Sequence, residues 1–411
     1  MANPETQLEN LRDRIEENDE ISADDREALE EFDKELVLRS KEYSTYRHLK
    51  LLRHVTIIAE NVGGLNDALI DRKAVKDIVA WIHRTYENEE TNQDYRVALK
   101  VFGRKVTDDG VANDPEQPPV SMYWVSSTKS ENYDASPDKR DMLEWEDIMA
   151  MVEEAQNKRD AAAITLQFDA GLRGFEFEDL TRRDIEDTPN GLRVHASGKT
   201  GSRTALLIPS VPYIQEWLEE HPAPNDPDAP LWCKLDSPER LSYRMISQMF
   251  KKPGQRADID KPLNITNFRK SSASFYAGEL TQPYLEKRYG WVKQSDAAAR
   301  YIAIFSDDVE KEILKIHGIE TEEETEDIAP VECYRCTKLN TREARFCSRC
   351  GQVIQPEAME DIMRIDGSVK DGYQAADDME DVEKIHQLDS LVQDIKNEPE
   401  LMEALIEELN T

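Results

Sequence analysis

The 411-residue sequence lacks long apolar runs, and it contains only five cysteines. No stretch approaches the roughly 20 consecutive apolar residues that cross a bilayer, and no charged segment followed by an apolar one opens the chain. We therefore expect a soluble, cytoplasmic protein. The length leaves room for two or three domains.

Cations are also scarce, because 52 lysines and arginines face 85 aspartates and glutamates, and the formal net charge is −33. In dilute buffer such a surface repels both itself and DNA. At molar salt the screening length falls to about 3 Å, so only contact-range interactions remain. The acids run through 13–35 and 144–187 as well as the tail. This distribution favours a halophilic protein from a salt-accumulating archaeal cytosol over an ordinary protein with an acidic tail.

Four of the five cysteines form two C-x2-C pairs ten residues apart, namely Cys333, Cys336, Cys347 and Cys350. Each pair makes a tight knuckle that points two thiolates inward, and two knuckles complete a tetrahedral site. The alternative is a pair of disulfides, but C-x2-C pairs bridge poorly and an intracellular protein keeps its thiols reduced. We expect a structural Zn²⁺ in a zinc ribbon at 330–353. Cys233 is expected to be a buried, apolar residue.

The N-terminal part is predicted to be helical. An acidic segment at 1–21 precedes helices at 22–105, where Ser22 and Asp25 suggest a capping box and Gly63-Gly64 ends a helix. The stripe of that helix consists of Leu51, Val55, Ile58 and Val62. Residues 106–136 are polar and aperiodic, which is typical of a linker.

Residues 137–318 are predicted to hold helices around a short three-strand stretch at roughly 183–208, so the fold class is mainly α with a small antiparallel β-sheet. Residues 356–411 form an acidic tail with short amphipathic helices, which cannot bury their stripes alone. Its apolar positions are Ile385, Leu388, Val392, Ile395, Leu401, Leu405, Ile406 and Leu409. They suit docking on the chain's own domains or on a neighbouring protomer.

Against the acidic background, clusters of basic residues favour phosphate contact over a merely solvated face. Three groups occur at helical spacing: Arg47, Lys50 and Arg53; Arg96, Lys100 and Arg104; and Arg244, Lys251 and Lys252. His48 and His54 lie among the first group and are expected to face solvent or the groove. No second set of ligands near them suggests a metal site.

A set of chemically distinctive residues is distributed, in a fixed order, over four segments of the chain. They read AGLRGFEFEDLTRRDIED, VHASGKTGSRTALLIP, NITNFRKSSAS and YGWVKQSDAAARYIAI, and they carry Arg173, Lys199, Arg269, Trp291 and Tyr301. Their order and spacing resemble the catalytic half of the tyrosine recombinase (phage integrase) family, here of haloarchaeal type. The family's first conserved motif, called the first box below, begins with the Gly-Leu-Arg sequence that ends at Arg173. Glu176, Leu180 and Asp184 also match this motif. The resemblance covers about 35–318 and implies a helical core-binding domain before the catalytic domain.

The resemblance implies a role for each residue. Tyr301 would be the nucleophile that forms a 3′-phosphotyrosine, while Arg173 and Arg269 hold the non-bridging oxygens. Lys199, at the tip of a predicted β-hairpin, would protonate the departing 5′ oxygen. The Trp291 indole N–H would donate to a phosphate oxygen, and Glu176 would orient the neighbouring cations.

Two positions depart from the family pattern. Thr266 replaces the second-box histidine and cannot shuttle a proton as imidazole does, and Lys270 stands where many members carry another histidine. The interval between Trp291 and Tyr301 is one residue longer than usual. The predicted function is site-specific DNA recombination on double-stranded DNA by a homo-oligomer, as a tetramer, with no metal or nucleotide in the chemical step. The alternatives are a DNA-binding regulator on an inactive recombinase fold and a type IB topoisomerase-like enzyme.

Overall fold

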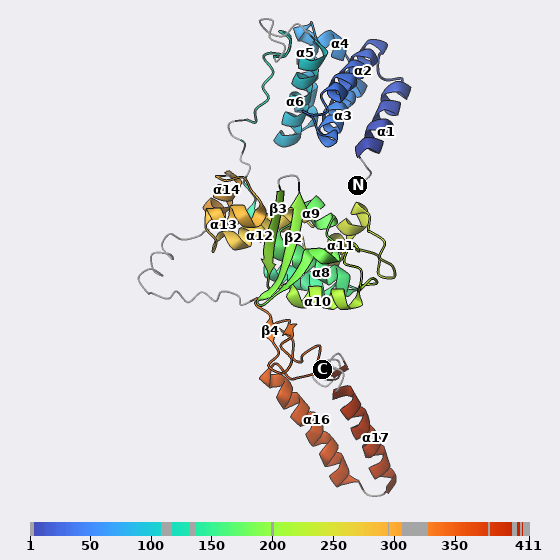
Figure 1. Cartoon of the computed structure of the whole chain (residues 1–411), viewed down its shortest axis with the longest axis vertical. Helices are drawn as coiled ribbons and strands as arrows, with labels where there is room; N and C mark the ends of the chain where they lie inside the picture. Colours follow the sequence, from blue (N-terminus) through green and yellow to red (C-terminus); the bar gives the residue numbers. More distant parts are fainter. Residues whose placement is uncertain are drawn as a thin grey trace, which may run out of the picture. The chain divides into compact units, whose positions relative to one another are not determined.

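The structure is a computed structural model that describes residues 4–107, 117–130, 133, 136–198, 201–294, 296–305, 328–376, 379–396, 401–402 and 405. The chain divides into two compact units, Met1–Ala135 and Ser136–Thr411, and each is described by itself (Figure 1). The boundary lies one residue before the predicted start of the catalytic domain at 137, which stays a prediction. None of the helices in the described ranges is long and apolar enough to cross a membrane.

The described part of the first unit is a bundle of helices around one apolar core. Its elements are α1 (Pro4–Glu17), α2 (Ala23–Leu38), α3 (Thr45–Asn61), α4 (Leu65–Ala68), α5 (Arg72–Thr85) and α6 (Glu89–Val106). The predicted stripe of α3 is confirmed, because Leu51, Val55 and Ile58 are buried. The helix ends where predicted, since Gly63 and Gly64 adopt left-handed φ values of 69° and 71°.

The first unit extends beyond its predicted limits at both ends. The predicted N-terminal acidic segment is not separate, because α1 buries Leu8, Leu11 and Ile15 in the core. Part of the predicted linker is also packed, since Met122 and Val125 are buried in the same core. Many charges around few apolar residues hid the first contribution, and the polar, proline-containing surroundings of the short stretch Val120–Val125 hid the second. Residues 108–116 of the predicted linker lie outside the described residues.

Ser22 caps α2 as predicted, by accepting a hydrogen bond from the Asp25 backbone N–H. Asp25 does not return the bond that would complete a capping box. Its buried carboxylate instead accepts from the backbone N–H groups of Gly64 and Asn66, at 2.9 Å each. This one side chain therefore fixes the turn between α3 and α4.

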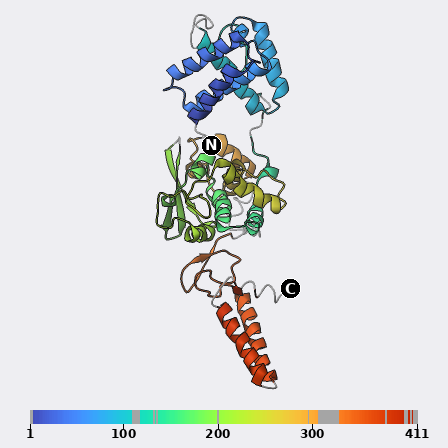
Figure 2. The ribbon, with the colours of Figure 1, turned by 90° about the vertical axis from the view of Figure 1, so that its right-hand side faces the viewer.

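The second unit contains the predicted three-stranded antiparallel sheet, in the order β1-β2-β3. Its described elements up to residue 305 are η2 (Lys139–Asp141), α7 (Trp145–Glu153), α8 (Lys158–Ala170), α9 (Gly174–Glu178), η3 (Arg182–Asp184), β1 (Ile185–Thr188), β2 (Gly191–Gly198), β3 (Gly201–Leu207), α10 (Val211–Glu220), α11 (Tyr243–Arg256), α12 (Ile265–Ala277), α13 (Gln282–Tyr289) and α14 (Asp296–Phe305). Most of α8 is buried, and α7, α10, α11 and α12 pack around it. Figure 2 shows the strands on one side of this region and helices on the other.

The C-terminal region combines a small two-stranded sheet, β4 (Val331–Glu332) and β5 (Leu339–Asn340), with a helical hairpin of α16 (Pro356–Ala375) and α17 (Met379–Lys396) (Figure 1). Phe346, from the cysteine segment, packs in one apolar cluster with Ile365 of α16 and Val392 of α17. The predicted tail stripe is used only in part, because the Leu388 side chain is 52% exposed. Within the described residues, the tail thus docks on the chain's own cysteine segment.

Candidate active site

The first box begins at a turn that only glycine fits. Gly171 ends α8 with φ of 55°, and a Cβ there would lie 2.5 Å from Cε1 of Tyr289. The glycine therefore lets the end of α8 press against the end of α13. Leu172 is buried, and Arg173 follows as the first residue of the turn into α9. This anchors the Arg173 backbone on the core while its guanidinium remains partly exposed.

Arg173 is held from two sides. Its Nη1 donates to Glu176 Oε1 at 2.7 Å, and its Nη2 donates to the carbonyl oxygen of Gly290 at 2.7 Å. The backbone N–H of Arg173 also donates to Glu176 Oε2 at 2.9 Å. The predicted orienting role of Glu176 agrees with these contacts. The carboxylate also binds Arg203 of β3, with Arg203 Nη2 2.8 Å from Glu176 Oε2.

Arg269 joins the same group from α12. Its Nη1 donates to the carbonyl of Gly171 at 2.6 Å, and its Nη2 donates to the carbonyl of Tyr289 at 2.7 Å. Arg173, Arg203 and Arg269 thus all donate hydrogen bonds to backbone carbonyls of two turns, one at 171 and the other at 288–290. Arg203 was missed by sequence reasoning, since an arginine beside a hairpin tip normally indicates a solvated strand end.

Glu176 binds two of the three guanidiniums, those of Arg173 and Arg203, and the pKa values of the group reflect this. Burial lowers the pKa of Arg269 to about 9, with repulsion from Arg203 and Arg173 adding to it. Burial would raise the pKa of Glu176, but hydrogen bonds and charge from Arg203, and then Arg173, hold it below its usual value. The cluster therefore has an excess of positive charge, which an anion such as a phosphate would balance.

Trp291 and Tyr301 lie against each other next to this cluster. The Trp291 ring stacks on Tyr301 at 5.5 Å between centroids and on Tyr289 at 5.1 Å. The guanidinium carbon of Arg269 lies 5.9 Å from the Trp291 ring centroid. Burial raises the pKa of Tyr301 to about 12, and the charge of Arg269 opposes this. Tyr301 is 9% exposed, so its hydroxyl is protonated near neutral pH and its ring is covered.

The other predicted catalytic positions are less well defined. Lys199 lies outside the described residues, although the pairing of Gly198 with Gly201 confirms a two-residue hairpin connection around it. Thr266 is exposed in the first turn of α12, one turn before Arg269, and Lys270 is exposed beside Arg269. Leu180 is buried, and Asp184 accepts from the Thr181 backbone and hydroxyl at 2.8 and 2.7 Å.

The predicted DNA contacts on the first unit need two corrections. Arg96 is not a surface residue: it is 4% exposed and donates to Glu89 Oε1 and to the carbonyls of Ser126 and Thr128. Two of its acceptors lie in a segment predicted to be a linker, so no sequence pattern indicates that Arg96 is buried. His48 does not face solvent either, because it is buried and its Nε2 lies 2.6 Å from Asp33 Oδ1.

The remaining basic candidates are at least partly exposed. Lys50 is bonded to Asp94 at 2.6 Å, and the exposed Arg53 donates to Gln7. His54 is half-buried, with its Nδ1 2.5 Å from the Lys50 carbonyl. On α11, all three candidates of the second unit are exposed, and their spacing places them on one helical face. Arg47, Lys100 and Arg104 of the first unit are partly exposed. Arg244, Lys251 and Lys252 are exposed and are called the α11 face below.

The four paired cysteines meet in space, with all four sulfur atoms within 4.8 Å of one another. The Sγ separations are 3.6 Å for Cys333–Cys350 and 3.5 Å for Cys336–Cys347. Both exceed the roughly 2.05 Å of a disulfide. They are close to the ~3.8 Å edge of a tetrahedron with Zn–S bonds of about 2.3 Å. The arrangement therefore fits the predicted ion, and all four cysteines are free thiols rather than the two disulfides of the alternative.

Cys233 is buried as predicted, but it is not without a histidine, because His221 Nε2 lies 3.4 Å from its sulfur. Burial raises the pKa of the Cys233 thiol and lowers the pKa of His221. The pair stays neutral in the core and does not form a nucleophile.

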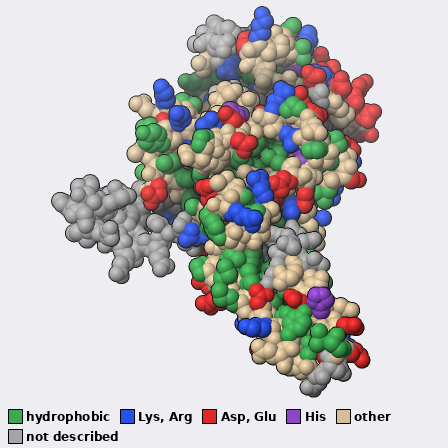
Figure 3. Space-filling model, turned by 60° about the horizontal axis from the view of Figure 1, so that its bottom comes forward, with side chains coloured by type: hydrophobic (Ala, Val, Ile, Leu, Met, Phe, Trp, Pro, Cys, Tyr) green, Lys and Arg blue, Asp and Glu red, His purple; other side chains and the backbone are tan. Residues whose placement is uncertain are grey.

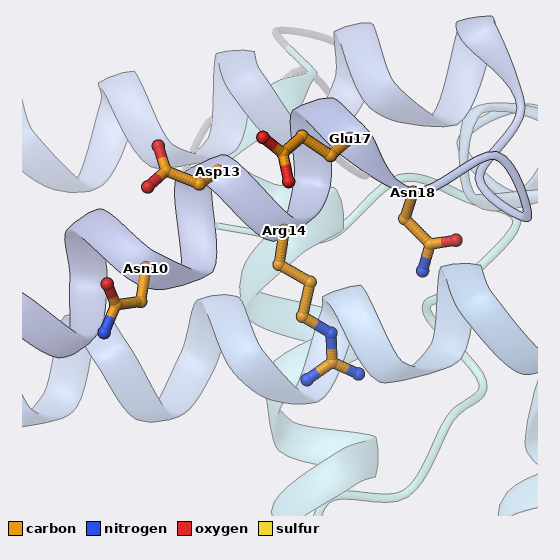
Figure 4. A pocket seen from close by; sticks show the side chains of 5 residues that line it. All are labelled: Asn10, Asp13, Arg14, Glu17 and Asn18. Carbon is orange, nitrogen blue, oxygen red and sulfur yellow. The ribbon is translucent and has the colours of Figure 1, made fainter.

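Two surface hollows lie in the described part of the chain. One is a shallow pocket on the first unit, lined by Asn10, Asp13, Arg14, Glu17 and Asn18 (Figure 4). Its carboxylates repel phosphate, and Arg14 is paired with Glu60. The other, of about 380 Å³, lies between β3 and α13 and includes Leu206 and the exposed Tyr284. Neither contains the three-arginine cluster.

Comparison with known proteins identifies the same region. Residues 141–307 match the model of the phage integrase family. The tyrosine recombinases XerC of Vibrio vulnificus (strain YJ016) and of Proteus mirabilis are each 25% identical over 116 residues, which is 28% of this chain and 37% and 38% of theirs. The chain thus spans less than two fifths of the length of these curated relatives.

Among solved structures, a lambda integrase tetramer bound to a Holliday junction matches with a TM-score of 0.51 and 15% identity, covering 67% of this chain and 76% of that one. A lambda integrase structure bound to DNA matches with a TM-score of 0.51 and 15% identity, covering 69% and 97%. The chain therefore has the fold of these recombinases, and its residues 141–307 match the phage integrase family model.

Proposed function

We propose that this protein is a site-specific DNA recombinase that cuts and rejoins DNA through a 3′-phosphotyrosine at Tyr301. The observation that carries the proposal is the convergence of Arg173, Arg269, Trp291 and Tyr301 around the turns at 171 and 288–290. These residues come from separate segments of the chain, and the fold gathers the types of side chain that phosphoryl transfer needs.

In the proposed reaction the Tyr301 hydroxyl gives its proton to water, its oxygen bonds to phosphorus, and the bond from phosphorus to the 5′ oxygen breaks. Arg173 and Arg269 hold the non-bridging oxygens while charge develops on them. Trp291 donates its indole N–H, and Lys199 gives a proton to the departing 5′ oxygen. Because burial and Trp291 cover Tyr301, the ring must turn out of its stack before it can reach a phosphate.

A nicked suicide substrate tests this chemistry, because loss of the short fragment traps the covalent step. In molar KCl the protein should leave an adduct that survives a denaturing gel. Tyr301→Phe should abolish the adduct while DNA binding persists. Tyr284→Phe is the matched control, since Tyr284 is 63% exposed on α13 and should not matter. An adduct that persists in Tyr301→Phe removes the nucleophile assignment.

The second candidate is a DNA-binding regulator on an inactive recombinase fold, which Thr266 favours because it cannot move a proton as histidine can. Thr266→His separates the two. Faster cleavage by this variant supports the enzyme, whereas no cleavage by either form on a mapped binding site supports the regulator. A topoisomerase-like activity is distinguished by relaxation of supercoiled DNA without site preference.

We propose a separate DNA contact on each unit: Arg47, Lys100 and Arg104 on the first unit, as a core-binding domain, and the α11 face on the second. In the space-filling view, carboxylates are spread over the visible face and are not confined to one segment (Figure 3). Basic groups are a minority there, so each exposed cluster counts. We further propose a halophilic, cytoplasmic setting and assembly as a tetramer on DNA, as in the lambda integrase structure bound to a Holliday junction.

We also propose that the four clustered cysteines hold a structural Zn²⁺. Four thiolates fill the tetrahedral shell, so the ion would stabilise the fold and leave no position for substrate. Such binding supplies on the order of 10 kcal/mol of folding free energy. Chelation or Cys347→Ser should therefore unfold roughly 330–353 and loosen α16 and α17, which pack on Phe346. The catalytic core should keep its melting transition, and its loss on chelation would contradict a purely local role.

A further inference from the structure

Arg203 is the most enclosed cation of the candidate site, since only 7% of its side chain is exposed. Its Nε and Nη2 donate to Glu176 Oε2 at 3.3 and 2.8 Å. Nη2 also reaches the carbonyl of Gly171 at 3.3 Å, and Nη1 donates to the carbonyl of Arg288. All three guanidinium nitrogens thus have protein acceptors, so Arg203 does not contact substrate.

The acceptors of Arg203 lie on the two turns that also hold the other arginines. Gly171 accepts from both Arg203 and Arg269, and the neighbouring carbonyls of Arg288, Tyr289 and Gly290 each accept from one member of the cluster. Gly290 leaves room for this, because a Cβ there would lie 2.9 Å from Cδ of Arg203. Arg203 therefore ties the first-box turn to the turn that leads into Trp291.

We propose that Arg203 is a positioning residue for strand cleavage: it shares Glu176 with Arg173 and locks the two turns together, so that Arg173 keeps its charge, and Arg269 its position, for the scissile phosphate. This rests on the proposed function. Without Arg203, Glu176 would face Arg173 alone and neutralise it. The Arg203 charge also contributes to the lowered pKa of Arg269, so its removal should raise that pKa.

The test compares Arg203→Met and Arg203→Lys with Arg193→Met on the neighbouring strand, where Arg193 makes only an exposed pair with Glu186. Single-turnover cleavage is measured on the suicide substrate, and binding is measured in a Tyr301→Phe background. Arg203→Met should slow cleavage roughly 10- to 100-fold with little change in binding. It should also move the alkaline limb of the rate profile to higher pH. Arg203→Lys should restore part of the rate, and Arg193→Met should behave as wild type.

A merely structural role would lower the melting temperature without moving the pH limb, and that result overturns the proposal. Cleavage at the wild-type rate by Arg203→Met also overturns it, while the proposed function stands. Failure of the wild-type protein to form any adduct refutes the proposed function, and this inference with it.

An independent observation concerns the cysteine segment. Residues 330–353 carry five basic and two acidic residues in a chain of net charge −33. The net charge of residues 330–353 remains positive even after the two negative charges of a Zn(Cys)4 core are included. Each knuckle places an exposed arginine directly before its second cysteine, Arg335 in the first and Arg349 in the second. Tyr334, beside Arg335, is 76% exposed.

We infer that the two knuckle tips form a second contact with the backbone of double-stranded DNA, apart from the catalytic cluster. The paired arginines can each approach a phosphate, and Tyr334 can donate its hydroxyl to another. An acidic protein partner is the rival occupant. The charge contrast with the rest of this chain favours DNA, because the same chain carries a candidate site for phosphodiester chemistry.

The experiment uses the full chain in a Tyr301→Phe background and a duplex that extends beyond the cleavage site. The double variant Arg335→Gln/Arg349→Gln should bind more weakly, and its log–log salt slope should become shallower by about 2, one unit for each lost phosphate contact. Arg364→Gln/Lys384→Gln, which removes two cations from α16 and α17, is the matched control and should keep the slope. Zinc content, measured by native mass spectrometry, verifies the fold. An unchanged slope with zinc retained overturns this inference and favours the acidic partner.

Discussion

Replacing Trp291 with alanine should release α14, because the indole fills the space between Tyr289 and Tyr301. Each aromatic pair contributes about 0.5–1.5 kcal/mol beyond its buried area, so losing both costs roughly 1–3 kcal/mol. A difference of about 1.4 kcal/mol is tenfold in an equilibrium constant. Local opening of Asp296–Phe305 should therefore become roughly 10- to 100-fold more frequent.

Hydrogen exchange of the α14 amides measures this opening, and a tyrosine labelled with ¹³C at Cζ in position 301 measures the pKa of the Tyr301 hydroxyl. Once uncovered, Tyr301 should lose the burial that raises its pKa to about 12, so its titration should move down toward 10. Trp291→Phe separates the two roles of the indole. It keeps a ring in the stack and should leave exchange near wild type, yet it lacks the N–H and should lower cleavage. Unchanged α14 exchange in Trp291→Ala would refute the stacking argument.

Three further predictions follow from the charge, the pKa values and the backbone. The kcat/KM for cleavage should fall above about pH 9 as Arg269 loses its proton. Under saturating DNA the fall in rate should occur at higher pH, because a bound phosphate stabilises the guanidinium cation. A profile that stays flat to pH 10 contradicts this. Thermal stability should rise from tenth-molar to several-molar KCl, and DNA binding should stay flat or improve; optimum stability at tenth-molar salt would sink the halophile proposal. Gly171→Ala should destabilise the second unit by about 2–5 kcal/mol, from left-handed strain and overlap with Tyr289. Gly367→Ala, inside α16 with open space around the new methyl group, should instead stabilise its helix by up to about 1 kcal/mol in denaturant melts.

The helices and the hairpin could be predicted because they follow from local signals. The stripe of Leu51, Val55 and Ile58 has helical period, and the residues of β2 and β3 have strand period. The residues that the sequence misplaced depend on distant partners. Leu8 reaches the core from a segment with few apolar residues, and Met122 from a short apolar stretch, PPVSMYWV, inside a polar segment, and neither pattern indicates its partners. Packing against remote elements decided their place.

The same division holds for the candidate site. The family motifs identified Arg173, which follows the glycine turn at 171, and Arg269 of α12, whereas Arg203 lies on a strand whose charged residues normally face water. Its enclosure depends on Glu176 and on backbone carbonyls from α13, more than 80 residues later in the chain. The sequence therefore predicts which segments meet, but the hydrogen-bond partners of each guanidinium emerge only from the fold.

Arg269 differs from the buried Arg96 and the largely buried Arg288 in the kind of partner that holds it. Arg96 binds Glu89 and Arg288 binds Asp169, so each buried charge is cancelled by a carboxylate of its own. Arg269 is held by the carbonyls of Gly171 and Tyr289, which orient a guanidinium without neutralising it. Carbonyl acceptors are thus the means by which a strongly acidic protein keeps a positive site. Because these cations are largely buried, molar salt screens them less than it screens the surface. The attraction for a phosphate that enters the cluster should therefore persist at ionic strengths that abolish long-range steering.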